Sequence, residues 1–93
     1  MKNYELMYIL VPELDENQIK EEITALNKIL IDNGASIEGV NEWGLRDLAY
    51  EIKKQTKGYY VIISFTSDPI ACQEFTRLVR LNQKVLRFLI TTN

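Results

Sequence analysis

The side chains in this chain that could do chemistry are mostly cationic, aromatic and carboxylate groups. Histidine is absent and Cys72 is the only cysteine, so there is no Cys/His metal cluster, no imidazole base and no Ser-His-Asp arrangement. Carboxylate catalysis and oxygen-only metal sites have no motif here. We therefore predict a protein that is not an enzyme and has no metal or cofactor. We interpret Cys72 as a small core residue, because no positive neighbour is present to activate its thiol.

Positive charge is concentrated in the second half of the chain. The net charge is −2, but residues 1–35 contain seven acidic and three basic residues, whereas residues 59–93 contain two acidic and four basic ones. Because a local patch governs binding more than the total charge does, two interpretations stay open: an ordinary charged surface and a nucleic-acid contact. The basic residues concerned are Arg46, Lys53, Lys54, Lys57, Arg77, Arg80, Lys84 and Arg87.

The composition is that of one globular domain. The 93 residues are 46% hydrophobic and 26% charged, which is typical of a soluble protein with one modest core. No run of 18 apolar residues is present to span a membrane, and the N-terminus begins directly in patterned sequence. A single cysteine suits a reducing compartment. We expect one cytoplasmic domain over residues 1–93.

The hydrophobic pattern predicts the elements that must position these side chains. Residues 4–11 are typical of a strand with two apolar faces. A helix should begin at Asp15, with Gln18 completing a capping box, and end at Asn33-Gly34. An extended segment is predicted over residues 36–52, with a bend at Gly39, followed by a hairpin turn at residues 55–58 and a strand over residues 59–66. A second helix should begin at Asp68-Pro69, and the last strand covers residues 85–91. The predicted inward stripe of this helix is Ile70, Cys72, Phe75, Leu78, Val79 and Leu81.

This element order predicts a ferredoxin-like fold of the α+β class. Strand, helix, strand, strand, helix, strand gives a four-stranded antiparallel sheet, and right-handed crossovers place both helices on one face. The other face stays open. If Leu6, Tyr8 and Phe65 point toward the helices, the opposite set forms an exposed apolar patch, which usually marks a binding surface. That set is Met7, Ile9, Tyr60 and Ile62.

The strand that begins after Lys57 partly resembles the main RNP motif of RNA-recognition domains, which stack bases on sheet aromatics. Lys57, Gly58 and Tyr59 match its first three positions. Tyr60 then stands where a small residue is needed, and Val61 and Ser64 replace stacking aromatics. Base stacking on the sheet is therefore disfavoured, and a protein partner fits this face better. Trp43 is consistent either with packing at the sheet end or with anchoring an interface.

Residues 43–54, WGLRDLAYEIKK, carry the most specific pattern in the chain. They closely resemble the G-x-R-x-L-A-Y-x-I-x-K signature of bacterial small-subunit ribosomal protein six. The resemblance runs from end to end. It includes Tyr4-Glu5, Pro12-x-Leu14-Asp15, Gly58-Tyr59-Tyr60 and Val85-Leu86-Arg87.

The resemblance implies a ferredoxin-like fold and a structural role in the small ribosomal subunit. Members of this family join a small basic protein, small-subunit protein eighteen, and the pair binds the central domain of 16S ribosomal RNA. Carried over by position, the RNA-binding residues would be Lys2, Arg46, Lys53, Lys54 and, as a weaker addition, Arg87. The protein-partner face would consist of Met7, Ile9, Tyr60 and Ile62, with Leu89 as a further member.

The chain departs from many family members at Asn3 and Asp47, where basic residues are frequent. Fewer positive charges should weaken unaided RNA binding and reduce its salt dependence, so that the basic partner supplies more of the contact. Two other classes remain as alternatives: a homodimeric ligand-binding regulatory domain of the same fold, and a small acylphosphatase-like hydrolase. The hydrolase would need an arginine-bearing loop after the first strand, where this chain has the acidic Pro12-Glu13-Leu14-Asp15.

Overall fold

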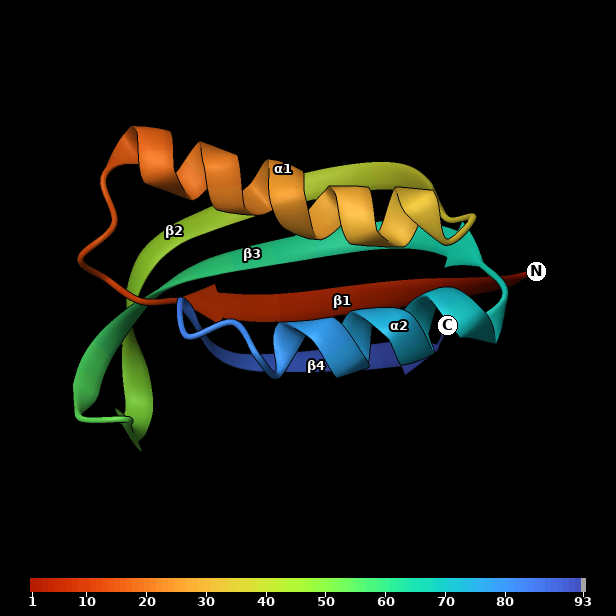
Figure 1. Ribbon diagram of the computed structural model, residues 1–93. Helices are drawn as coiled ribbons and strands as arrows, with labels where there is room; N and C mark the ends of the chain where they lie inside the picture. Colours follow the sequence, from red (N-terminus) through yellow and green to blue (C-terminus); the bar gives the residue numbers. More distant parts are fainter. Residues whose placement is uncertain (93) are drawn as a thin grey trace.

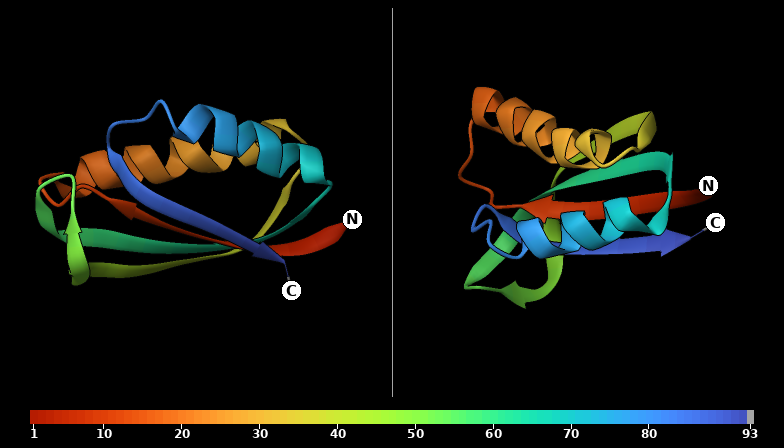
Figure 2. Two further views of the ribbon diagram at one scale, coloured as in Figure 1. Left: turned by 90° about the horizontal axis from the view of Figure 1, so that it is seen from below. Right: turned by 45° about the vertical axis from the view of Figure 1, so that its right-hand side comes forward.

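The computed structural model describes residues 1–92, and its strands form one antiparallel sheet in the order β2-β3-β1-β4. Both helices lie on one side of the sheet, as the left panel of Figure 2 shows most clearly (Figures 1 and 2). The predicted ferredoxin-like fold is confirmed. The elements are β1 (Lys2–Leu10), α1 (Glu16–Asp32), β2 (Ser36–Ile52), β3 (Gln55–Ser67), α2 (Pro69–Val79) and β4 (Val85–Thr92).

The core lies between the helices and one face of the sheet. Leu6 and Tyr8 of β1 and Phe65 of β3 are fully buried, as predicted, because successive strand residues point to opposite faces. Leu26 of α1 and Phe75 of α2 are buried against them. The opposite face, which we call the open face, is left without a covering layer in the described residues 1–92 (Figure 2). In the same residues, no helix is long and apolar enough to cross a membrane.

Helix α1 begins and ends where the sequence predicts. The Asp15 carboxylate accepts the backbone N–H of Gln18 at 2.8 Å, and the Gln18 side chain accepts the backbone N–H of Asp15 at 3.0 Å. This completes the capping box. After the helix, Gly34 has φ +91°, a left-handed conformation that glycine adopts without steric cost.

The hairpin turn lies three residues earlier than predicted. Ile52 pairs with Gln55, so Lys53 and Lys54 form a two-residue turn with φ of 50° and 65°. Positive φ at both central residues is the signature of a type I′ turn, which usually contains Asn or Gly. Gly58, which suggested the turn at residues 55–58, lies inside β3 and is buried.

Helix α2 also differs from the predicted stripe. Ala71, Phe75 and Val79 are buried, whereas Ile70 and Leu81 are exposed. The side chain of Asp68 makes no capping hydrogen bond; instead, the Ser67 hydroxyl donates to the backbone carbonyl of Asp68 at 2.9 Å. Cys72 is half-buried against the core, and burial raises the pKa of its thiol. This agrees with a packing role for Cys72.

The β2-β3 hairpin is long and strongly bent. Its register shifts between Ile37 and Gly39, again after Glu42, and a third time after Asp47. Such bulges bend a strand and increase its twist. Figure 1 shows the end of the hairpin curving away from the rest of the sheet. We call the segment from Arg46 to Lys57 the hairpin end.

Candidate partner and nucleic-acid surfaces

An apolar row crosses the middle of the open face. Met7 of β1 pairs with Ile62 of β3 on one side and with Leu89 of β4 on the other, so the three side chains lie next to one another. Leu89 is 55% exposed, and Met7 and Ile62 are half-buried. These positions match the predicted apolar patch.

Two aromatic rings extend this row toward the hairpin end. The rings of Trp43 in β2 and Tyr60 in β3 are stacked, with centroids 6.5 Å apart and an interplanar angle of 17°. Trp43 is 47% exposed, so it does not pack into the sheet end. We define the apolar patch as Met7, Trp43, Tyr60, Ile62 and Leu89.

Ile9 has to be removed from the predicted partner face. It belongs to the same strand face as Met7, but it is only 3% exposed. The cause is Gly58: a Cβ atom at that position would overlap the Ile9 Cγ2 atom, and the Leu48 side chain lies close by. Glycine therefore lets the hairpin pack directly on Ile9. The hairpin end covers Ile9 from within the chain, which alternation along β1 cannot reveal.

A hollow of about 320 Å³ lies within the open face. Its floor is the apolar row, and polar groups surround it at the end away from the hairpin turn. The lining residues are Glu5, Met7, Asn41, Trp43, Ile62, Leu89 and Thr91.

Two arginines of the predicted RNA set lie over aromatic rings. The Arg46 guanidinium carbon is 5.2 Å from the centre of the Trp43 ring, and that of Arg87 is 5.7 Å from the centre of the Tyr50 ring. Arg87 also donates to the Tyr50 hydroxyl. Both distances are within the range of cation–π attraction. The aromatic rings therefore hold the two cationic groups on the protein surface.

Tyr50 connects the two edges of the sheet. β2 and β4 are the outermost strands, yet Tyr50 of β2 contacts Arg87 of β4 because the hairpin end bends. Tyr50 is 59% exposed and was not predicted as a site residue. A register shift separates it from Asp47, so alternation along the strand does not indicate which face it joins.

Lys53 and Lys54 add two exposed cations at the turn itself. Lys57 contributes less, because its ammonium lies 3.9 Å from the Asp47 carboxylate. Four of the five predicted RNA-binding residues therefore lie toward the end of the sheet from which the hairpin extends. We call Arg46, Lys53, Lys54 and Arg87 the cationic cluster.

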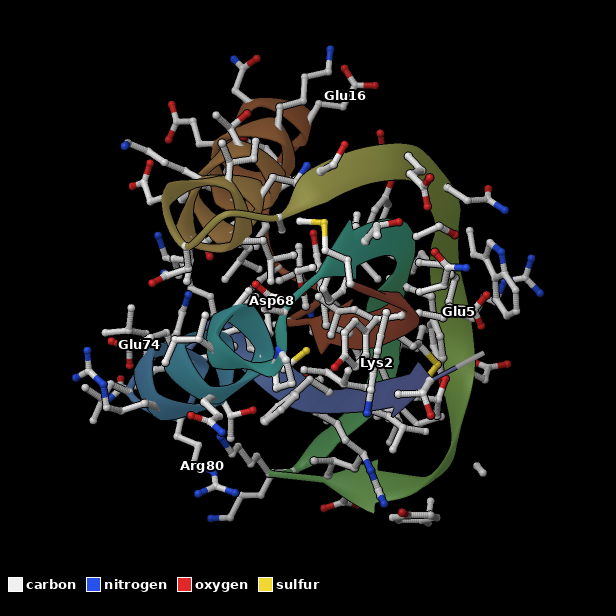
Figure 3. The ribbon with its side chains drawn as sticks, turned by 90° about the vertical axis from the view of Figure 1, so that its right-hand side faces the viewer. Lys2, Glu5, Glu16, Asp68, Glu74 and Arg80 are labelled. Atoms are coloured by element: carbon white, nitrogen blue, oxygen red, sulfur yellow. The ribbon has the colours of Figure 1, made fainter. Side chains whose placement is uncertain are left out.

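Lys2 lies apart from this cluster. It pairs with Ser67, the last residue of β3, whereas Lys53 and Lys54 precede its first residue. The 13-residue length of β3 separates the two positions. Lys2 also lies on the same face of β1 as Tyr4 and Leu6, which is the face toward the helices. Figure 3 views the molecule from this end and labels Lys2 there.

Tyr59 joins β3 to β2 on the helix side of the hairpin. Its hydroxyl donates to a Glu42 carboxylate oxygen at 2.8 Å. Burial, followed by this hydrogen bond to an anion, raises the pKa of Tyr59 to about 12. The contact joins Tyr59 of β3 to the residue that precedes Trp43 in β2.

Comparison with known proteins finds one consistent family. The family model described as ribosomal protein S6 matches residues 3–92. A small ribosomal subunit protein bS6 from Halalkalibacterium halodurans is 48% identical over 91 residues, covering 98% of this chain and 96% of that protein. The bS6 protein of Thermoanaerobacter pseudethanolicus is 44% identical over 90 residues, covering 97% and 95%.

A solved structure shows the same arrangement of elements. The crystal structure of 30S ribosomal protein S6 from Thermotoga maritima superimposes with a TM-score of 0.94 at 29% identity. The match covers 99% of this chain and 87% of that one.

Proposed function

Because this chain belongs to the ribosomal protein S6 family, we propose that it binds the central domain of 16S ribosomal RNA together with small-subunit protein eighteen and so promotes assembly of the small subunit. In this role it is a structural protein of the cytoplasmic ribosome, acts without a cofactor and catalyses no reaction. The apolar patch binds the partner protein, and the cationic cluster binds RNA.

The observation that carries this proposal is the continuity of the two surfaces. Trp43 stacks on Tyr60 of the apolar patch and also lies beneath the guanidinium of Arg46. A protein bound on the patch would therefore border the cationic cluster. RNA at that border would contact both proteins at once, which is the geometry that cooperative binding requires.

The cationic cluster suits phosphate groups of RNA. Arginine can contact a phosphate through two N–H groups, whereas lysine acts as a compact point charge. Four cations form a small footprint, and the Asp47 carboxylate beside Lys57 reduces the local positive charge further. We therefore expect weak, salt-sensitive RNA binding by the free protein and much tighter binding in the presence of the partner.

The test is a titration of a 16S central-domain fragment at two salt concentrations, with and without small-subunit protein eighteen. We expect Ile62→Asp to abolish the increase in affinity caused by the partner. Ile31→Asp is the matched control, because Ile31 is exposed on α1 at 54% and lies away from the open face. Circular dichroism should show that both variants are folded.

The RNA surface is tested by the slope of log affinity against log salt concentration. Replacing Arg46 and Lys53 by Ala should reduce this slope by about two, at roughly one per phosphate contact. Replacing Lys20 and Lys28 of α1 makes the same charge change elsewhere and should leave the slope unchanged. If the protein binds no RNA under any condition and forms a stable homodimer, the regulatory-domain alternative is favoured instead.

A further inference from the structure

The hollow on the open face combines an apolar floor with a carboxylate. Met7, Ile62 and Leu89 form the floor, Trp43 flanks it, and Glu5 stands beside it. Glu5 is exposed on the side of the sheet away from the helices (Figure 3). Within residues 1–92, no cation lies in ion-pair contact with its carboxylate, and no donor forms a hydrogen bond to it. The hollow therefore offers a negative charge beside an apolar surface.

The charge on the open face changes sign along the strands. Glu5 and Glu38 lie at one end, where the Glu38 carboxylate accepts a hydrogen bond from Thr66 at 2.8 Å. Arg46 belongs to the hairpin end, and Arg87 of β4 lies over Tyr50 of the same segment. Phosphate would be repelled by the acidic end, so RNA is disfavoured there and a cationic protein segment is favoured. A bound partner can satisfy this polarity in only one orientation.

We propose that the hollow binds an arginine side chain of the partner protein, with its aliphatic stem on the apolar floor and its guanidinium paired with Glu5. This inference rests on the proposed function and names the partner chemistry that the open face recognises. A volume of about 320 Å³ is at the small end of the roughly 300–1,000 Å³ typical of ligand pockets, which suits one long side chain. Arginine fits better than lysine, because its planar guanidinium binds a carboxylate through two N–H groups at once.

The experiment measures binding of small-subunit protein eighteen to Glu5→Gln and Glu5→Lys variants by calorimetry at low and high salt. We expect Glu5→Lys to weaken binding by at least about tenfold at low salt, since it places like charges together, and Glu5→Gln to weaken it less. Glu21→Lys is the matched control: it makes the same charge change on an exposed residue of α1 and should alter affinity by less than about twofold.

A charge-reversal scan then identifies the arginine. Each arginine of the partner is changed to Glu and tested against wild-type protein and against Glu5→Arg. One of these partner variants should bind Glu5→Arg at least about fivefold more tightly than the wild-type partner does, because only a residue that faces Glu5 can couple to it. If no arginine shows such coupling, the proposal is wrong.

The outcomes separate this inference from the proposed function. If Ile62→Asp abolishes partner binding while Glu5→Lys behaves like Glu21→Lys, the partner binds the patch but places no cation in the hollow. If neither Ile62→Asp nor Glu5→Lys affects binding, the partner does not bind this face and both proposals fail. A wild-type homodimer that Glu5→Lys dissociates, detected by sedimentation, would make a second copy of this chain the occupant and overturn the proposal.

Discussion

The Lys53-Lys54 turn should lower the stability of the folded protein while supplying two positive charges to the cationic cluster. Lys53 and Lys54 adopt φ of 50° and 65°, where side chains with a Cβ atom are strained. Asn-Gly is the sequence that prefers such a type I′ turn. Replacing the pair with Lys53→Asn and Lys54→Gly should therefore relieve strain in the folded hairpin while removing two positive charges from the cationic cluster.

The expected magnitude follows from the two positive φ angles. A left-handed conformation costs about 1 kcal/mol or more at most residues with a Cβ atom, so the native turn stores about 2 kcal/mol. Asn and Gly both adopt this conformation readily, Asn through local hydrogen bonds of its side chain, so the substituted turn loses most of that strain. The new glycine makes the unfolded chain more flexible, which offsets about 1 kcal/mol of the gain. A net increase of about 1 kcal/mol in the free energy of unfolding remains. For a domain of this size it should raise the melting temperature by about 4–8 °C.

The assay pairs thermal unfolding with RNA titration. The control is Lys53→Gln with Lys54→Gln, which removes the same two charges but gives the turn no preferred sequence. Both variants should lose RNA affinity and reduce the salt slope by about two. Only the Asn-Gly variant should gain stability. If the two variants are equally stable, the turn stores no strain; if both bind RNA as the wild type does, the turn lies outside the RNA footprint.

Two further predictions concern the packing and the pH dependence of the hairpin. Gly58→Ala should reduce the free energy of unfolding by about 1–3 kcal/mol in urea denaturation, because the added methyl group overlaps Ile9. In an Ile9→Ala background the same substitution should be nearly neutral, and a full loss there would refute the steric explanation. The pKa of Tyr59 is raised in the folded state from 10.0 to about 12, so the folded protein holds this proton more tightly than the unfolded chain does. The corresponding stability is complete below pH 10 and disappears as the pH rises through about 12. Between these pH values, Tyr59→Phe should therefore lose less stability than the wild type. If the free energy of unfolding depends on pH identically in both proteins, the pKa of Tyr59 is not raised by folding.

The features predicted correctly from the sequence are those determined by neighbouring residues. The capping box of α1 involves Asp15 and Gln18, and the end of α1 depends on Gly34, so local spacing is sufficient to predict both. The alternation of β1 and β3 likewise placed Leu6 and Phe65 inside. In each case the relevant partner lies within a few residues or the strand period alone decides the face.

The features that were missed depend on contacts between distant segments. Gly58 resembles a turn glycine in the sequence, but its role is to let the hairpin pack on Ile9, some fifty residues away in the chain. Lys53-Lys54 contains no residue that favours positive φ, so nothing local indicates the true turn. The separation of Lys2 from the cationic cluster follows from the antiparallel pairing of β1 with β3.

The bend of the hairpin explains how a chain of net charge −2 can still present an ordered cationic surface. By bringing Tyr50 from one edge of the sheet to Arg87 on the other, the bend gives Arg87 an aromatic partner, as Trp43 does for Arg46. Immobilising a free arginine on binding costs about 0.5–1.5 kcal/mol, and a side chain already held over a ring has less of this freedom left to lose. Pre-ordering of two arginines thus compensates in part for the small number of charges. Gly58 of the same hairpin packs directly on Ile9, so the hairpin that orders the cationic cluster also removes Ile9 from the surface open to the protein partner.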